Sequence, residues 1–577
     1  MRVPAAVALV LVAAHAWGQS EPTRVAILLA EGRKQPTSAD IATLRAGTRS
    51  RDPDAARTAV RALGRLGRPN LIPDIALSLR HALPEVRAEA ANALAQAARG
   101  AEPVRNAGTA AKNVRSPQAS LAQSALTERL DVEDEPSVRA AICESLARLP
   151  LQNGPAIERI ERALVDVAER HDTITDRLGV AKAFEALVRL HGKVHPPGAS
   201  AVELLTALVG VRAIQDPARD ARVRRLALQS LIAAEAADDA VLDRAMDDAD
   251  PQVRRLAIRA SGGTTRGAAR LGAGLLDASP MVRIEAILAF SSGDQRLACA
   301  TWIRSSHDQT LLVELTALDQ LARCGGSDDA MIFLEQLTRD GEDLADPRGW
   351  HRPAHALLSL AAASPDKARD VLAAFTKSER WQVREVAARA AVLLRSSDAL
   401  ATLARDSHAA VRGAAQNVRQ SATSSATPSD AAPPLTADDL RRLAAPRARF
   451  TIKDLGRFDV ALFGTEAPAT VARFAALVDA GRFTGLSFRG LVPNSSITMA
   501  PTDPPIVAPD EVGLWPHVRG AVGLASDGEN AGAIFIDLVD NPEFDHRHTV
   551  FGQLLNGIDV VDLLLEGDVI ESIEILP

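Results

Sequence analysis

The chain has 577 residues, too many for a single hydrophobic core, and this length indicates several structural units. Hydrophobic residues make up 47% of it and charged residues 24%, which is ordinary for a globular protein. The formal net charge of -7 leaves no basic footprint, so we expect no nucleic-acid partner.

Residues 1–18 have the pattern of a secretory signal. Arg2 gives a positive start, residues 4–14 (PAAVALVLVAA) form a short apolar run, and Ala16 and Gly18 are small residues two apart. An uncleaved membrane anchor is the alternative, but the run is shorter than the roughly 20 residues of a spanning helix. We therefore expect cleavage after Gly18, export to the periplasm or the outside of the cell, and no stable membrane insertion of the mature chain.

A tetrapeptide repeats through residues 40–419. The pattern Pro-x-Val-Arg begins at Pro84, Pro136, Pro251 and Pro280, and weaker copies without the proline begin at Ala221, Trp381 and Ala409. The valines of three successive copies, Val223, Val253 and Val282, are 30 and 29 residues apart, and such a period indicates stacked units. These units resemble HEAT repeats, which implies an α-solenoid that binds protein partners.

Each repeat carries an arginine after its valine. One hypothesis is a ladder of arginines that faces a partner; the other, which we favour, pairs each arginine with an acidic residue of the adjacent repeat. Three histidines, His307, His351 and His355, have no ligand partners at metal spacing and are expected to be packed or exposed.

Cysteine is scarce, since only Cys143, Cys299 and Cys324 occur. We expect all three to be small buried core residues. The alternative is a bond between Cys299 and Cys324, if their helices adjoin. Neither a Cys-x-x-Cys pair nor a Cys/His cluster is present, so no zinc site is expected.

A linker and a second domain follow the repeats. Residues 420–436 are rich in Ser, Thr, Ala and Pro and have no apolar periodicity, which predicts a linker. A short helix is expected over residues 436–443, because Thr436 and Asp439 have the spacing of a helix cap. From Arg449 the chain changes to short alternating strands and turns, with a helix after Pro468, and this pattern predicts a closed barrel.

Three segments of this region are similar to the cyclophilin-type peptidyl-prolyl isomerases. They are residues 481–488 (GRFTGLSF), 519–525 (RGAVGLA) and 544–552 (FDHRHTVFG), and the resemblance covers residues 449–577 in order. It implies a multidomain chain in which an α-solenoid is followed by a closed antiparallel β-barrel with two helices. It also implies cis-trans isomerisation of X-Pro bonds in a protein or proline-containing peptide client, without metal or cofactor.

The catalytic strand of that family reads Phe-His-Arg, two residues, Pro, whereas residues 488–493 read FRGLVP here. Arg489 therefore occupies the family's histidine position, and Gly490 occupies its arginine position. A displacement of one residue along a strand points a side chain to the opposite face, so Arg489 is expected to miss the pocket. A bulge at Gly490 that swings Arg489 back is the alternative, and Arg489 remains the catalytic candidate.

The resemblance assigns substrate binding to six residues: Thr498, Ala525, Ser526, Phe535, Phe544 and His548. Among them, Ser526 replaces the family's asparagine, and Thr498 replaces the glutamine that supports the arginine. Four further residues differ from those that the family has around the pocket. Ser495 and Ser496 replace Phe-Met in the pocket floor, Ala533 replaces a glutamine, and Glu543 replaces a tryptophan. About half of the pocket wall is therefore expected to remain.

Two other sites are weighed against this one. His546 and His548 are two apart, but no third ligand is near in sequence, so we expect no metal. The acidic residues Asp537, Asp540 and Glu543 are expected to form a solvated edge rather than an acid/base pair.

Two functions are compatible with these observations. The first is an exported folding factor whose solenoid captures clients and whose barrel isomerises X-Pro bonds, with weak or lost catalysis. The second is a non-catalytic interaction protein whose barrel binds peptide or packs on the solenoid. Gly490 and the altered pocket floor favour the second, while Phe535, Phe544 and His548 favour the first.

Overall fold

The computed structural model describes residues 21–33, 36–100, 117–151, 153–211, 216–262, 266–290, 295–416, 435–443, 447–502, 505–526 and 532–576. The predicted signal and nearly all of the predicted linker lie outside these residues. Among the helices that the structure describes, none is long and apolar enough to cross a membrane.

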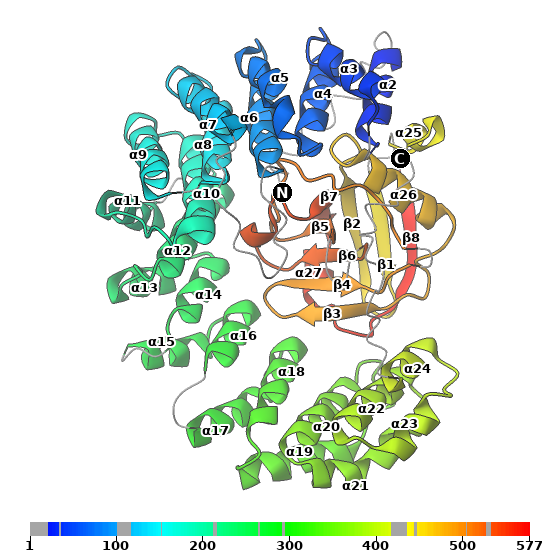
Figure 1. The fold of residues 1–577 in the computed structure, drawn as a ribbon. Coiled ribbons are helices and arrows are strands. Elements are labelled where there is room, and N and C mark those ends of the chain that lie inside the picture. Colours follow the sequence, from blue (N-terminus) through cyan, green and yellow to red (C-terminus); the bar gives the residue numbers. More distant parts are fainter. Residues whose placement is uncertain are drawn as a thin grey trace.

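Helices stack in two rows to form an arc, which is the expected solenoid (Figure 1). The inner row comprises α4 (Pro53–Arg65), α6 (Pro84–Arg99), α8 (Pro136–Ala147), α10 (Ile174–His191), α12 (Pro217–Ala233), α14 (Pro251–Arg259), α16 (Pro280–Ala289), α18 (Leu311–Gln320), α20 (His351–Ala363), α22 (Trp381–Leu394) and α24 (Ala409–Ala415). The outer row comprises α3 (Ser38–Gly47), α5 (Ile72–Ala76), α7 (Pro117–Leu130), α9 (Gly154–Arg170), α11 (Ala199–Val209), α13 (Asp239–Met246), α15 (Gly267–Gly274), α17 (Gln295–Ser305), α19 (Asp328–Asp340), α21 (Pro365–Phe375) and α23 (Ser397–Leu403). The first described helix, α2 (Glu21–Glu31), packs against α3 and α4, so the array begins before residue 40.

Six of the seven copies of the tetrapeptide begin an inner helix of the array, and the copy at Ala221 lies in the second turn of α12. The proline of the tetrapeptide lies in the first helical turn, where the missing amide hydrogen costs nothing, and its valine is buried in every copy. In six copies the arginine binds a carboxylate further along the array: Arg87 to Glu133, Arg139 to Asp176, Arg224 to Asp248, Arg254 to Asp277, Arg283 to Asp308 and Arg384 to Asp406. The arginines of the repeat are therefore structural, as the second hypothesis holds.

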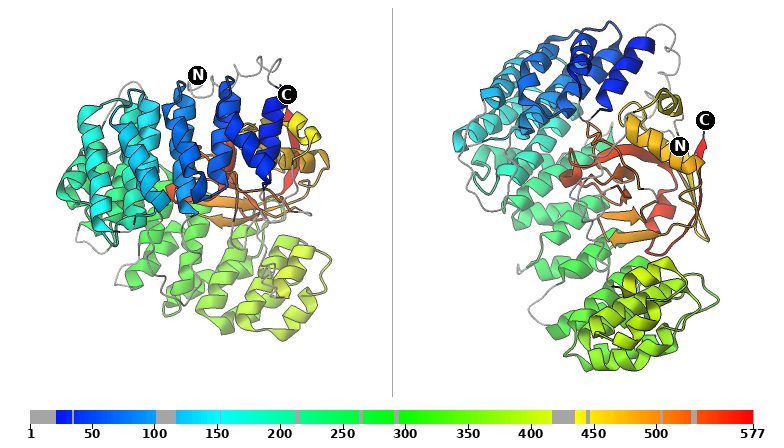
Figure 2. Two further views of the ribbon diagram at one scale, coloured as in Figure 1. Left: turned by 45° about the horizontal axis from the view of Figure 1, so that its top comes forward. Right: turned by 45° about the vertical axis from the view of Figure 1, so that its right-hand side comes forward.

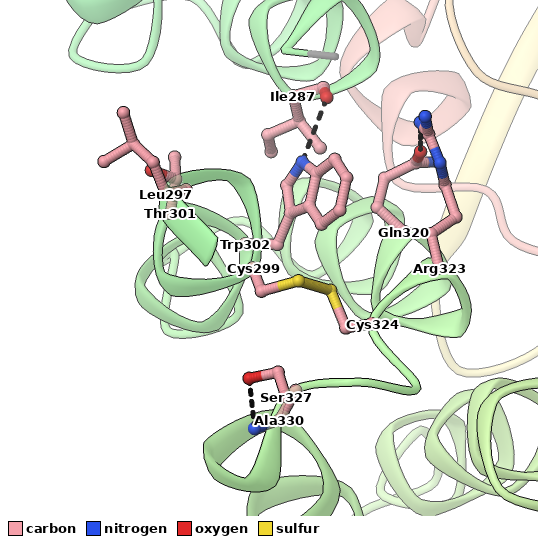
Figure 3. Close-up of a disulfide and its surroundings, with 10 residues drawn as sticks. All are labelled: Ile287, Leu297, Cys299, Thr301, Trp302, Gln320, Arg323, Cys324, Ser327 and Ala330. Carbon is pink, nitrogen blue, oxygen red and sulfur yellow. Dashed lines mark hydrogen bonds between the residues drawn. A yellow bond between two sulfur atoms is a disulfide. The ribbon is translucent and has the colours of Figure 1, made fainter. Parts of the chain in front are cut away.

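All three cysteines are buried in the core, as expected, and the alternative of a bond between Cys299 and Cys324 also holds. Cys299 of α17 and Cys324 form a disulfide, with Cα atoms 5.9 Å apart (Figure 3). Cys143 is free and buried. Cys324 directly follows the short 3-10 helix η4 (Leu321–Arg323), which brings it beside α17. The bond thus depends on how two neighbouring helices stack.

The C-terminal domain is one antiparallel sheet of eight strands in the order β3-β4-β6-β5-β7-β2-β1-β8. The strands are β1 (Arg447–Ile452), β2 (Gly456–Leu462), β3 (Phe488–Val492), β4 (Ser496–Met499), β5 (Ala521–Leu524), β6 (Ile534–Asp537), β7 (Thr549–Asn556) and β8 (Ile570–Leu576). The helices α26 (Pro468–Asp479) and α27 (Ile558–Asp562) accompany it, and the cap between Thr436 and Asp439 begins α25 (Ala437–Arg442).

The prediction of a closed barrel holds only in part. The edge strands β3 and β8 share no ladder; they meet at one bridge, Ser487 to Val569, and at backbone hydrogen bonds around it. The sheet is therefore a curved half-barrel, filled by phenylalanines such as Phe450, Phe458 and Phe474.

The C-terminal domain lies in the hollow of the arc (Figures 1 and 2). Its strands β3, β4 and β6 face the middle of the solenoid, while α26 lies near the first helices and β8 runs from the side of the last repeats toward α25. Side chains of α4 and of α22 both bind it, although these helices are more than 300 residues apart in sequence. The fold thus places one domain between the two ends of the other.

Candidate functional site

Strand β3 contains a bulge at the position where the resemblance expects the catalytic arginine. The register with β4 shifts between Arg489 and Val492, and Gly490 adopts φ +59, a left-handed conformation that favours glycine. A Cβ atom built on Gly490 would lie 3.6 Å from the Cβ of Thr498. The position therefore faces the expected pocket but carries no side chain there.

Arg489 binds the solenoid instead. Its Nη1 donates to Oε1 of Glu385 in α22 at 2.7 Å, and its guanidinium lies 6.0 Å from the ring centroid of Trp381. Arg389 of the same helix also contacts Glu385, at 3.2 Å. The bulge is present, but it leaves Arg489 in a contact with another domain.

The expected substrate-binding residues come together from four segments. Phe535, Phe544 and His548 form a mutual ring cluster with centroids 5.4 to 5.8 Å apart. Thr498 is the cross-strand neighbour of Phe535, and the backbone N–H of Ser526 donates to Nδ1 of His548 at 3.2 Å. Ala525, the sixth residue, precedes Ser526 and bonds to Ala533 through its backbone. The six residues thus lie together around an aromatic cluster, which is the wall that the resemblance implies for a proline pocket.

A buried pair behind the wall was not foreseen as part of the site. His517 Nδ1 lies 2.8 Å from Oδ2 of Asp537, and both side chains are fully buried. Burial raises the pKa of Asp537 to about 6, although the hydrogen bond from His517 opposes that shift. The sequence signal was an isolated histidine before the RGAVGLA segment, with its partner 20 residues later on β6.

The expectation of a solvated acidic edge is wrong for Asp537 and Asp540. Asp537 is covered by His517, and Asp540 accepts from Arg225 of α12 at 2.6 Å. Burial would raise the pKa of Asp540, but Arg225 and Arg222 lower it below its ordinary value. Packing within the C-terminal domain removes Asp537 from water, and packing against the solenoid does so for Asp540; local sequence reveals neither.

No metal site accompanies the pocket among the residues described. No group of three or more His, Cys, Asp or Glu side chains with metal-ligand geometry occurs there. His546 contributes to the domain interface instead, since its Nε2 lies 2.7 Å from Oε1 of Glu144 in α8. Of the three histidines expected to be packed or exposed, His307 lies beside Phe333, His351 stacks on Trp350 and His355 contacts Asp319.

Comparison with known proteins agrees with this geometry. The family model described as cyclophilin type peptidyl-prolyl cis-trans isomerase matches residues 447–575, and the HEAT repeats model matches residues 41–147. A peptidyl-prolyl cis-trans isomerase of Helicobacter pylori is 32% identical over 145 residues, which are 22% of this chain and 87% of that protein. The chain belongs to the cyclophilin-type peptidyl-prolyl cis-trans isomerase family.

Two further similarities lie in the same cyclophilin-type domain. The peptidyl-prolyl cis-trans isomerase B of Bacillus subtilis is 27% identical over 137 residues, covering 22% of this chain and 95% of that protein. A crystal structure of a Cryptosporidium parvum cyclophilin type peptidyl-prolyl cis-trans isomerase is 19% identical, with a TM-score of 0.21, and the match covers 23% of this chain and 98% of that one.

The cyclophilin-like domain is anchored to the first repeats by arginines of α4. Arg61 donates to the carbonyl of Thr465 at 2.6 Å and to Glu466, and Arg65 donates to the carbonyl of Glu511 at 2.7 Å. Both guanidinium groups also bind Glu31 of α2. Burial would raise the pKa of Glu466, but the guanidinium groups of Arg57 and Arg61 lower it to about 2.

The last repeats hold the other end of the cyclophilin-like domain. Arg348 donates to the carbonyl of Leu563 at 2.5 Å, and Arg389 contacts Glu566 at 3.2 Å. Between the two ends, Asn494 of the β3–β4 turn donates to Glu285 of α16 at 3.0 Å. The interface therefore runs along the inner row of the solenoid and includes segments that flank the pocket.

Proposed function

We propose that this protein is an exported interaction and folding factor whose cyclophilin-like domain holds proline-containing segments of client proteins with little or no isomerase activity. The observation that carries the proposal is the position of Arg489. Its guanidinium is bound to Glu385, and Gly490 stands where the family's catalytic arginine is expected.

The chemistry of isomerisation explains why this position matters. Rotation about an X-Pro bond must cross a barrier of roughly 18–20 kcal/mol that comes from amide resonance. A fixed cation beside the prolyl amide favours the twisted state over the planar ones, and loss of one preorganised donor typically costs a factor of about 10² to 10³ in rate. Thr498 in place of the supporting glutamine and Ser495 and Ser496 in the pocket floor act in the same direction.

Binding of a proline side chain needs less than catalysis does. The ring cluster of Phe535, Phe544 and His548 supplies an apolar wall, and Ser526 and Thr498 supply polar groups beside it. The HEAT repeats add an extended array of the kind that binds proteins. These features support a role in holding clients or assemblies.

Two observations support export. Residues 1–18 have the pattern of a secretory signal, and Cys299 and Cys324 form a disulfide. Disulfides persist in oxidising compartments such as the periplasm, and they are rare in the cytosol. Neither observation depends on the pocket, so export stands apart from the loss of catalysis.

A second candidate is a cyclophilin-like domain that only packs on the solenoid. It is favoured by the contacts at both ends of the domain and by the ion pair of Asp540 with Arg225 near the pocket. In that case the domain would bind no peptide, and peptide titration separates the two candidates.

The test is exchange NMR on an Ala-Pro peptide in the presence of the full chain, with the Helicobacter pylori isomerase as positive control. We expect the wild type to bind the peptide and so broaden its signals. Its acceleration of cis-trans exchange should be about 100-fold smaller than that of the control, or smaller still. Gly490→Arg should gain activity, while Gly490→Ala, which shares the strained backbone, should not. Isomerisation by the wild type at the rate of the control would overturn the proposal, and an absence of any binding would favour the second candidate.

A further inference from the structure

The buried pair behind the pocket belongs to a larger network centred on His517, Asp537 and Asn541. Asp537 accepts from both partners, with His517 Nδ1 at 2.8 Å and Asn541 Nδ2 at 2.7 Å. The backbone N–H of Asn541 donates to the carbonyl of His517 at 2.8 Å, which closes the triangle. All three side chains are buried, so each hydrogen bond lies in a medium of low dielectric constant.

This network contacts each ring of the aromatic wall. The His517 ring stacks on Phe535 at 5.6 Å and meets Phe544 edge-on at 5.8 Å. Its Nε2 lies 3.2 Å from the backbone carbonyl of His548. The position of the imidazole therefore sets the positions of the groups that would face a proline ring.

The same network also fixes the floor of the pocket. Asn541 Nδ2 donates to the carbonyl of Ser495 at 3.0 Å, and the N–H of Leu538 donates to that carbonyl at 2.8 Å. The backbone N–H of His517 donates to Asp545 at 2.6 Å, which ties in the turn before His548. The residues of the network thus connect Ser495, the aromatic rings and the turn before His548 to one another.

The solenoid binds the residue next to this network. Asp540 precedes Asn541, and its carboxylate accepts from Arg225 of α12 at 2.6 Å. Its backbone N–H donates to Oε1 of Gln252 in α14 at 2.7 Å. Arg225 is itself held by both carboxylate oxygens of Asp250, so the group that meets Asp540 is fixed.

We propose that Arg225 and Gln252 are positioning residues for the pocket: by holding Asp540, the solenoid holds Asn541, Asp537 and His517 and so orders the aromatic wall. The proposal rests on the proposed function, since the ordered wall is the one that would bind a proline-containing segment. Affinity for that segment then depends on docking of the solenoid. A network of buried hydrogen bonds transmits a displacement because an unmade bond in it is costly.

The experiment uses the full chain with 13Cε1-labelled histidines and the Ala-Pro peptide as probe. Arg225→Ala and Gln252→Ala each remove one contact to Asp540, and Gln252→Ala leaves every ion pair in place. Arg389→Ala is the matched control, because it removes contacts to Glu566 and Glu385 at the far end of the interface and touches no residue of the network. His517→Gln assigns the His517 signal.

We expect Arg225→Ala to weaken peptide binding about tenfold, the effect of losing one hydrogen bond to a charged group, and to shift the His517 and His548 signals. Gln252→Ala should shift the same signals by less, and Arg389→Ala should change neither signals nor affinity. Unchanged signals in both Arg225→Ala and Gln252→Ala, or equal changes in Arg389→Ala, would overturn the proposal. If the wild type binds no peptide, the proposed function fails while the histidine signals still decide whether the solenoid orders the wall.

Discussion

Arg489 of strand β3 donates to Glu385 of helix α22 at 2.7 Å, across the boundary between the two domains. Arg489 is the arginine nearest in sequence to the family's catalytic position, and its partner belongs to the solenoid. The contact joins residues 104 apart in sequence and lies beside the bulge at Gly490. Gly490, which aligns with the family's catalytic arginine by resemblance, is thus next to Arg489, which contacts the solenoid.

The pair of Arg489 and Glu385 should stabilise docking of strand β3. We expect Arg489→Ala and Glu385→Ala to show a coupling of about 1 kcal/mol in a double-mutant cycle, because Arg489 is 31% exposed and solvent screens the pair. Amide hydrogen exchange of residues 488–492 measures the local opening free energy. Glu385→Ala alone should cost more, since Arg389 also loses a partner. Strictly additive effects would show that the ion pair contributes nothing.

Acid should release the first repeats from the cyclophilin-like domain. The pKa of Glu466 falls from 4.5 to about 2 in the docked state, so its contribution is complete above about pH 4.5 and is lost as the pH falls toward 2. A shift of this size corresponds to about 3 kcal/mol. Hydrogen exchange of α4 between pH 5 and pH 3, corrected for intrinsic rates, measures the release. In Glu466→Gln, α4 should already exchange faster at pH 5, and its exchange should change less between pH 5 and pH 3. An equal pH response in that variant would contradict this account.

A methyl group at Gly523 should disturb the pocket wall. A Cβ there would lie 2.4 Å from Cζ of Phe535, closer than atoms can approach, so the ring must move. We expect Gly523→Ala to destabilise the domain by about 1–3 kcal/mol and to abolish binding of the Ala-Pro peptide. Gly413→Ala in α24 is the control, because a Cβ added at Gly413 would meet no atom within 4 Å. Thermal unfolding and peptide titration of both variants check the prediction, and wild-type peptide affinity in Gly523→Ala would refute it.

Thiol chemistry should distinguish the three cysteines. Burial raises the pKa of the Cys143 thiol to about 12, so the native chain should show no fast-reacting thiol. One thiol should react after unfolding, and two more after unfolding with reduction. Loss of the bond that closes 25 residues, in the double variant Cys299→Ala and Cys324→Ala, should cost about 3 kcal/mol locally. Three thiols in the unfolded, unreduced chain would show that the bond does not form.

Local patterns in the sequence predicted most of the architecture. The copies of the tetrapeptide predicted seven of the inner helices and their arginine pairs, because proline in a first helical turn and a buried valine act within one repeat and its neighbour. The cap of Thr436 and the helix after Pro468 are likewise short-range features. The frame from Phe488 to Pro493 assigns Gly490 to the family's arginine position by resemblance, and this assignment stays a prediction.

Tertiary structure alone decided where the two domains meet and which charges are buried. Asp540 was expected on a solvated edge, and no sequence pattern marked Glu466, yet Arg225 and Arg61 cover them from repeats several hundred residues away. The disulfide and the network around His517 depend in the same way on which faces meet. Periodicity identifies the apolar face of each helix or strand, but a polar face has no such signature. Its partner is determined only when the whole chain brings two surfaces together and removes water from between them.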